Sequence, residues 1–547
     1  MLKSPELVLR RERQINCRLE RFLRIRKETV FHFPALFIIG EANMEDRSVL
    51  SSLFSRREFI KGVGAFSAAS ATIWAGGCEA CLTQIQQQIA NRPTRKNIQT
   101  LWDASHSDPV IATYKSAVQK MKALSSSDPS NPLGWEFQAQ IHNSSCLHRN
   151  WLWLPWHRVY LVYFERICRK LTGDDTFAMP YWNWNTHPAI PDPFWDTSSS
   201  LYDSNRAATQ GETADQSYIG TSVLNGILGQ TNFELFASLK PLAGQNLHFP
   251  SDGESATEAG LEPTPHDNIH GFVGGDMGGF LSPRDPLFYT HHCMIDCLWA
   301  HWNIDLGNAN TNDTDWTSYV ISDFYDENGN SVKVPVAETI LFPLLTYQYE
   351  PCSFLNQGAG NKKKLEGKAL EQFLRAGTPS KLEFVQRFEV RQEVAAEIRK
   401  AATVAIKVQP GAFSDAIQGG SRNRVVLTIA GVEIPAKRDF YVRVFLNKPD
   451  VSAETPIEDP HYAGSFGFFY DEASMKKHGG EQMQASGAQQ RPRTGYLVDV
   501  TATLQKLNQG GSLASEVNVS FVPVPYSHRE STGHLTLQRL ELAAVRF

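Results

Sequence analysis

Hydrophobic positions in the first two thirds of the chain recur with the spacing of amphipathic helices. The segments DPVIATYKSAVQKMKAL (108–124) and WHRVYLVYFERICRKL (156–171) place apolar residues three and four positions apart, which aligns them on one helical face. We therefore expect a mainly helical domain over residues 85–349. Within it, residues 195–260 are rich in Ser, Thr, Gly and Asn with little periodicity, which predicts a long surface excursion between helices.

The pattern changes towards the C-terminus. Residues 350–390 contain NQGAGNKKKLEGKAL, a composition that predicts a linker. Beyond it, short runs such as RNRVVLTIAGVEI, RDFYVRVFLN and SEVNVSFVPV are rich in β-branched residues and are separated by turn-forming residues. Their spacing predicts an antiparallel β-sandwich, a β-rich C-terminal domain over residues 391–547.

The N-terminal region carries an export pattern. Residues 55–61 read SRREFIK, a twin-arginine motif, and the small-residue apolar stretch GVGAFSAASATIWAGG follows at 62–77. This combination predicts a bacterial export signal with its lead-in over residues 44–84, and hence a periplasmic or secreted protein. Residues 1–43 are then expected to be a non-native or disordered extension. The apolar stretch is too short to cross a bilayer, so no membrane span is expected.

The composition narrows the possible partners. Of the 547 residues, 41% are hydrophobic and 20% are charged, and the net charge is −5, so the chain lacks the basic field that holds nucleic acids. Eight cysteines over this length are too few for a disulfide scaffold. We expect no nucleic-acid partner, and association into a homo-oligomer stays open.

Histidines concentrate in two short stretches. The first contains His142, His148 and His157, and the second contains His266, His270, His291 and His292. Because His266 and His270 are four residues apart, they project from one face of a helix and can share a metal ion. His157 begins a helix whose apolar stripe points it into the protein interior. Facing helix pairs of this kind predict a dinuclear metal site inside a bundle.

The ligand type limits the metal. Imidazoles without a thiolate cluster or a Glu-x-x-His pair exclude iron–sulfur and carboxylate-bridged di-iron sites, and leave zinc, copper or nickel. Zinc hydrolase sites usually include carboxylates. Six imidazoles, three for each ion, favour a pair of copper ions that react with dioxygen.

Long motifs around these histidines resemble a known family. LPWHRVYLVYFE, with an upstream His and Cys-x-His, resembles the first copper site of the tyrosinase and polyphenol oxidase family. PHDNIHGFVGG and SPRDPLFYTHHCMIDCLW resemble its second copper site. The resemblance covers roughly residues 90–349 and implies a four-helix bundle around a dicopper centre. FYVRVFLN and PHYAGSFGFF are similar to parts of the β-rich domain that follows in plant polyphenol oxidases.

The resemblance implies six copper ligands. They are His142, His148 and His157 for one ion, and His266, His270 and His292 for the other. In the family's paired histidines the second is the ligand, so His291 is placed beside the site and not on the metal. Cys146 occupies the position of a cysteine that is linked by a thioether bond to the second histidine, here His148; the alternative is a small buried thiol.

Further residues take roles from the same resemblance. Glu262 corresponds to an acid that holds a water near the copper pair, a candidate base for the phenol, or else is a simple loop acid. Asp267 stands where many tyrosinases have Asn, and could strengthen proton abstraction. Phe280 lies where relatives place a gate over the copper, or else anchors its loop. Asp296 is expected to orient a metal-bound imidazole, or else to be an ordinary helix acid.

A tyrosine motif, Tyr347-Gln348-Tyr349, resembles the one that closes the family's catalytic domain. The implied activity is copper-dependent oxidation of small phenols, with dioxygen as co-substrate: o-diphenols to o-quinones, and monophenols to o-diphenols. Two alternatives are a dioxygen-binding protein of the hemocyanin type and a dinuclear zinc hydrolase. By analogy with the family, the C-terminal domain is also expected to shield the site by inserting a side chain over the coppers.

Overall fold

The computed structural model describes residues 90–245, 247–248, 257–351, 382–409, 411–418, 423–470, 492–509, 515–526 and 530–547. All of them belong to one unit of the chain, residues 53–547. The predicted export signal (44–84) and the preceding extension (1–43) lie outside the described residues, as does most of the predicted linker. Within the described part of the chain, no helix combines the length and apolar character needed to cross a membrane.

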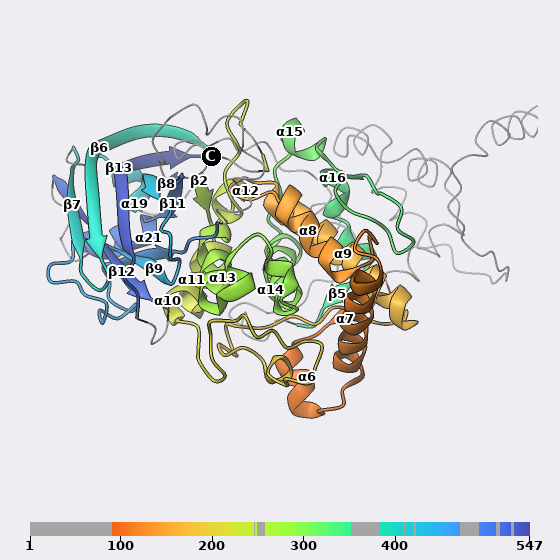
Figure 1. Ribbon diagram of the computed structural model, residues 1–547. Coiled ribbons are helices and arrows are strands. Elements are labelled where there is room, and N and C mark those ends of the chain that lie inside the picture. The colour runs from red at the N-terminus through yellow and green to blue at the C-terminus, as the bar shows by residue number, and fades with distance from the viewer. Residues whose placement is uncertain are drawn as a thin grey trace, which may run out of the picture. The chain divides into compact units, whose positions relative to one another are not determined.

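The first half of the described chain is helical, as the periodicity predicts (Figure 1). Its main helices are α7 (Pro109–Ser127), α8 (Trp135–Ser145), α9 (Trp153–Thr172), α13 (Asp267–Val273) and α14 (Leu287–Ala300). Helix α7 begins where the Asp108 side chain accepts hydrogen bonds from the backbone N–H groups of the first turn. Helix α9 ends at Gly173, whose φ of 75° is a conformation that favours glycine.

Shorter elements complete this half. They are β1 (Thr94–Arg95), α6 (Ile98–Ala104), α15 (Thr314–Thr317), β3 (Val320–Ile321), β4 (Val334–Pro335), α16 (Val336–Thr339), α17 (Phe342–Leu345) and β5 (Gln348–Tyr349). Strands β1 and β5 pair in parallel, so the two ends of the helical half meet.

The predicted surface excursion over residues 195–260 is wrong. This region contains the short helices α10 (Gln216–Ile219), α11 (Thr221–Leu228) and α12 (Phe233–Phe236). Tyr218 and Phe236 are fully buried in the core of the helical half. Periodicity missed these elements because helices of only one or two turns are too short to show a helical period.

Two β-sheets form the C-terminal half. One has the strand order β10-β9-β12-β7 and the other β2-β11-β8-β13-β6. The strands are β6 (Glu383–Glu397), β7 (Ala402–Lys407), β8 (Asn423–Glu433), β9 (Phe440–Leu446), β10 (Tyr462–Phe466), β11 (Arg493–Asp499), β12 (Glu516–Pro525) and β13 (His534–Arg546). Two short helices accompany them, α19 (Ser414–Ile417) and α21 (Thr501–Gln509). Both sheets contribute to one hydrophobic core, for example through Leu427 of β8 and Val444 of β9, as expected of stacked sheets.

Two details of this half were not anticipated. Strand β6 begins at Glu383, before the end of the predicted linker (350–390). Strand β2 (Thr257–Ala259) belongs by sequence to the helical half, yet it pairs in parallel with β11 at the edge of the five-stranded sheet. The chain continues from β2 into η2 (Glu262–His266), a short helical turn that carries candidate site residues.

Candidate metal centre

The structure brings both histidine clusters to one buried place. His142 comes from α8, His157 from α9, His266 from η2, His270 from α13, and His291 and His292 from α14, whereas His148 precedes α9 in a loop. None of the seven side chains is more than 4% exposed. The clusters meet where the rings of His157 and His292 stack, with centroids 4.2 Å apart.

Backbone carbonyls fix the orientation of three of these rings. Nδ1 of His142 lies 2.6 Å from the Phe280 carbonyl oxygen, Nδ1 of His157 lies 2.8 Å from that of Trp153, and Nδ1 of His270 lies 2.6 Å from that of Met277. A carbonyl oxygen can only accept, so Nδ1 carries the proton in each ring and Nε2 keeps its lone pair. The three rings therefore offer Nε2 to a metal ion.

The distances between ring nitrogens suit shared ions. Nε2 of His142 and His148 lie 3.4 Å apart, and Nε2 of His270 and His292 lie 3.3 Å apart. Four-coordinate ions with metal–nitrogen bonds of about 2.0–2.1 Å need ligand atoms about 3.3 Å apart. The His266 Nε2 atom is buried and has no hydrogen-bond partner among the described residues. The residues present thus fit two imidazole-bound metal ions.

Burial keeps the imidazoles neutral. It lowers the pKa of both His142 and His266 to about 3, and burial with the neighbouring imidazoles lowers the pKa of His148, His270 and His292 well below the usual value. The charged form loses its hydration in this interior. At neutral pH the rings are therefore in the form that binds metals.

A group of buried acids lies beside both clusters. Glu262 Oε1 accepts a hydrogen bond from the backbone N–H of Arg149 and lies 3.4 Å from His148 Nδ1. Asp267 Oδ1 lies 2.8 Å from His266 Nδ1. Glu258, which sequence analysis missed, accepts a hydrogen bond of 3.1 Å from Arg149 Nε.

The three buried carboxyl groups have unusual pKa values, although the positive charge of Arg149 counteracts part of each shift. Burial raises the pKa of Asp267 to about 8. Burial, together with repulsion from Glu258, raises the pKa of Glu262 well above its usual value, and burial with repulsion from Asp267 does the same to the pKa of Glu258. Burial and mutual repulsion therefore make all three carboxylates stronger bases than exposed acids.

Cys146 ends helix α8 and is fully buried. Its Sγ atom and one ring nitrogen each of His142 and His148 all lie within 4.8 Å of one another. Burial raises the pKa of the thiol well above its usual value. The predicted partners of the thioether bond are therefore neighbours.

Aromatic rings from both halves of the chain cover the imidazoles. Phe280 is 5% exposed, and its ring stacks on that of His148 with centroids 6.4 Å apart. Phe469, which follows β10, lies closer: its ring centroid is 4.8 Å from that of His148 and 4.5 Å from that of His270. Phe280 and Phe469 contact each other, with centroids 5.4 Å apart. The C-terminal half therefore supplies a side chain directly against the candidate metal site.

The backbone beside Phe469 is fixed on the helical half. The Gly467 N–H donates to the Pro263 carbonyl oxygen, and the Phe469 carbonyl oxygen accepts from the Arg149 guanidinium. A Cβ atom at position 467 would lie 2.8 Å from the Asn268 backbone nitrogen, so only glycine allows this approach.

Asp296 does not have the predicted partner. Its carboxylate accepts hydrogen bonds from the guanidinium groups of Arg95 and Arg158 and from the hydroxyl groups of Tyr347 and Tyr349. No imidazole is among the contacts described for it. Burial alone would raise the pKa of Asp296, but the two arginines lower it. The prediction failed because Arg95, 201 residues earlier in the chain, is the stronger partner for a buried carboxylate.

Comparison with known proteins agrees with this arrangement. A family model described as the common central domain of tyrosinase matches residues 119–259 and 244–305. (+)-Larreatricin hydroxylase of Larrea tridentata is 27% identical over 506 residues, covering 84% of this chain and 80% of that protein. Polyphenol oxidase II of Ipomoea batatas is 31% identical over 405 residues, covering 65% of this chain and 64% of that protein. The chain is therefore similar to tyrosinases and polyphenol oxidases, and residues 119–305 match their common central domain.

Solved structures share the fold of this chain over both halves. Latent apple tyrosinase superposes with a TM-score of 0.58 at 20% sequence identity, covering 83% of this chain and 97% of that one. Latent aurone synthase superposes with a TM-score of 0.59 at 22% identity, covering 84% and 90%. A helical core followed by a sheet-containing C-terminal domain is therefore common to all three. The names of both curated relatives describe them as chloroplastic, so they lend no support to a twin-arginine signal.

Proposed function

We propose that this chain is a copper-dependent oxidase of small phenols. The observation that carries the proposal is the pair of buried imidazole groups, with nitrogen spacings of 3.4 Å and 3.3 Å that suit shared ions. His142, His148 and His157 would hold one copper ion, and His266, His270 and His292 the other. Helices α8, α9, α13 and α14 would then act as a four-helix bundle around a dicopper centre.

The reaction balances with dioxygen as the oxidant. Two o-diphenols give two o-quinones, and the four electrons and four protons released reduce one dioxygen to two waters. A monophenol first gains one oxygen atom at the ortho position to become an o-diphenol, which then loses two electrons and two protons; the second oxygen atom leaves as water. The copper pair supplies the electron transfer when bound.

The chain's own acids would move the phenol proton. Glu262 would hold a water near the imidazoles, and this water would accept the proton of the incoming phenol. Asp267, which is hydrogen-bonded to His266, is a second proton acceptor. We propose that Glu262→Gln lowers monophenol oxidation more than catechol oxidation, because a catechol loses its protons more readily. Asp267→Asn would show whether the extra carboxylate shifts the same ratio.

The C-terminal domain would regulate access. Phe469 lies where a phenol ring would have to stack on His270, and Phe280 would act as a gate beside it. Activity measured before and after proteolysis within residues 350–390 tests the shield; equal activities would dismiss it. Because hydrogen bonds hold Gly467 and Phe469 on the helical half, the cleaved domain has to be removed under mild denaturant before the second measurement. Cys146 would hold His148 in place through a thioether bond.

The test of function is parallel assay of copper-loaded protein on tyrosine-like monophenols and on catechols, with copper and zinc content measured. Quinone formation with about two coppers per chain supports the proposal. Reversible dioxygen binding without quinone formation would indicate a carrier of the hemocyanin type, and hydrolysis with bound zinc would indicate the hydrolase.

We further propose that residues 1–43 are an extension, that residues 44–84 are a twin-arginine export signal, and that 85–349, 350–390 and 391–547 are catalytic domain, linker and C-terminal domain. N-terminal sequencing of the mature protein from the periplasm or medium tests the signal. Light scattering of the same material tests for a homo-oligomer.

A further inference from the structure

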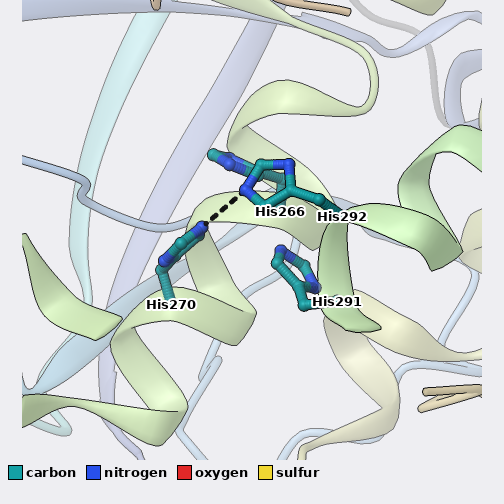
Figure 2. Close-up of side chains that lie close together, drawn as sticks. All are labelled: His266, His270, His291 and His292. Atoms are coloured by element: carbon teal, nitrogen blue, oxygen red, sulfur yellow. Dashed lines mark hydrogen bonds between the residues drawn. The ribbon is translucent and has the colours of Figure 1, made fainter. Parts of the chain in front are cut away.

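Helix α14 presents two adjacent imidazoles to the second cluster, His291 and His292 (Figure 2). His292 Nε2 lies 3.3 Å from His270 Nε2, which suits a shared ion. His291 is equally buried, and its ring centroid is 5.0 Å from that of His270 and 5.5 Å from that of His266. The second metal position is therefore surrounded by four imidazoles, although three suffice for the proposed function.

Neither ring nitrogen of His291 has a hydrogen-bond partner among the described residues. A neutral imidazole has one N–H donor and one acceptor, and leaving both unpaired in the protein interior costs free energy. The neighbouring rings show the usual solution, since Nδ1 of His270 is paired with a backbone carbonyl. An apolar side chain would fill the position of His291 without this cost, so its nitrogens require an explanation.

Distances indicate how a fourth imidazole could be used. One ring nitrogen from each of His266, His270, His291 and His292 lies within 4.8 Å of the other three. Two ligands on one ion with bonds of about 2.0–2.1 Å cannot lie more than about 4.1 Å apart. If the fourth nitrogen lies as far as 4.8 Å from another ligand atom, its ring would have to move by roughly 1 Å to bind the same ion. The arrangement therefore suits three fixed ligands and one that exchanges.

We propose that His291 is an auxiliary ligand of the second copper ion, which it binds whenever the position used by dioxygen is free. The inference rests on the proposed function, because it assumes copper at this position. It assigns His291 a role in taking up and retaining the ion, and not in oxidising the phenol. The ion would pass from four imidazoles to three as the fourth ring swings away.

The test measures copper affinity and not activity. Purified wild-type protein is titrated with Cu(I) against a chromophoric chelator, and the two dissociation constants are compared with those of His291→Ala. We expect the variant to bind one of its two ions about tenfold more weakly, as is usual when a group supporting a metal site is lost. Added imidazole should restore that affinity, which a loss of packing alone would not allow.

Leu298→Ala is the matched control. Leu298 is fully buried on the same helix and its side chain has no atom that can bind a metal, so this variant should lose stability and keep both dissociation constants. If His291→Ala does not accumulate in folded form, His291→Gln takes its place in the titration. Unchanged affinity in a folded His291 variant would overturn the inference. Wild-type protein that binds two coppers but forms no quinone would refute the proposed function and leave the inference about His291 standing.

Discussion

Removing the Phe469 ring should increase the affinity of the enzyme for catechols. Phe469 is 4% exposed, and its ring lies 4.5 Å from that of His270, centroid to centroid. A substrate ring has to displace it. Returning a buried Phe side chain to water costs about 1.5–3 kcal/mol, so the open form amounts to roughly 0.6–7% of the molecules.

The apparent KM is raised by the inverse of that open fraction when substrate binding is at equilibrium. We therefore expect Phe469→Ala to lower the KM for catechol by about 14- to 160-fold, with little change in kcat, because the alanine variant retains every imidazole. The assay is the initial rate of quinone formation by the copper-loaded full-length chain over a range of catechol concentrations.

Phe468→Ala is the matched control. Phe468 is the adjacent residue and is also buried, but its ring packs against Phe440 and Phe466 inside the sandwich. Both variants should lose about 3–5 kcal/mol of stability, the usual cost of truncating a buried Phe. The same KM in Phe469→Ala and wild type, or an equal fall in both variants, would refute the reasoning, since the effect would then not depend on the ring over the imidazoles.

Three further outcomes are expected. In copper-loaded protein, the peptide that contains Cys146 and His148 should be lighter by two hydrogen atoms, and Cys146→Ser should show the unmodified mass; an unmodified wild-type peptide would exclude the thioether bond. The pKa of Glu258 is raised in the folded state. Below the unfolded-state pKa, Glu258 is protonated in both states and does not change the free energy of unfolding. As pH rises from there towards the folded-state pKa, the unfolded state binds fewer protons than the folded state, so stability falls. Urea denaturation of copper-free Glu258→Gln should therefore show a weaker fall with pH than wild type, and parallel curves would contradict this. Asp296→Asn should cost about 3–5 kcal/mol by urea denaturation, because it leaves two buried guanidinium groups without their carboxylate; a loss below about 1 kcal/mol, typical of exposed pairs, would count against that network.

The sequence predicted what depends on local pattern. The period of apolar residues located α7 and α9, and runs of β-branched residues located β8, β9 and β12. Histidine spacing located the candidate site because ligands that share a helical face have to be three or four residues apart. Each of these patterns depends only on residues that are close together in the sequence.

The remainder depends on contacts between distant segments. Glu258 stands in a polar stretch with no periodicity, and only its place beside Arg149 makes it part of the site. Phe468 and Phe469 are adjacent aromatic residues after a strand-like run. The sequence cannot show that Phe468 packs inside the sandwich while Phe469 faces the imidazoles. Asp296 was assigned to an imidazole because Arg95 is remote in sequence. Single-sequence reasoning does not reach such pairings.

The pairing of β2 with β11 has a consequence for how the enzyme is made. Ribosomes synthesise the chain from the N-terminus, so Glu258 and the turn that carries Glu262 and His266 emerge long before β11 does. Until residues 493–499 have been made, the strand that leads into the second metal position has no neighbour in its sheet. We therefore expect copper acquisition at that position to follow completion of the whole chain, and a nascent helical half to hold at most the ion of the first cluster.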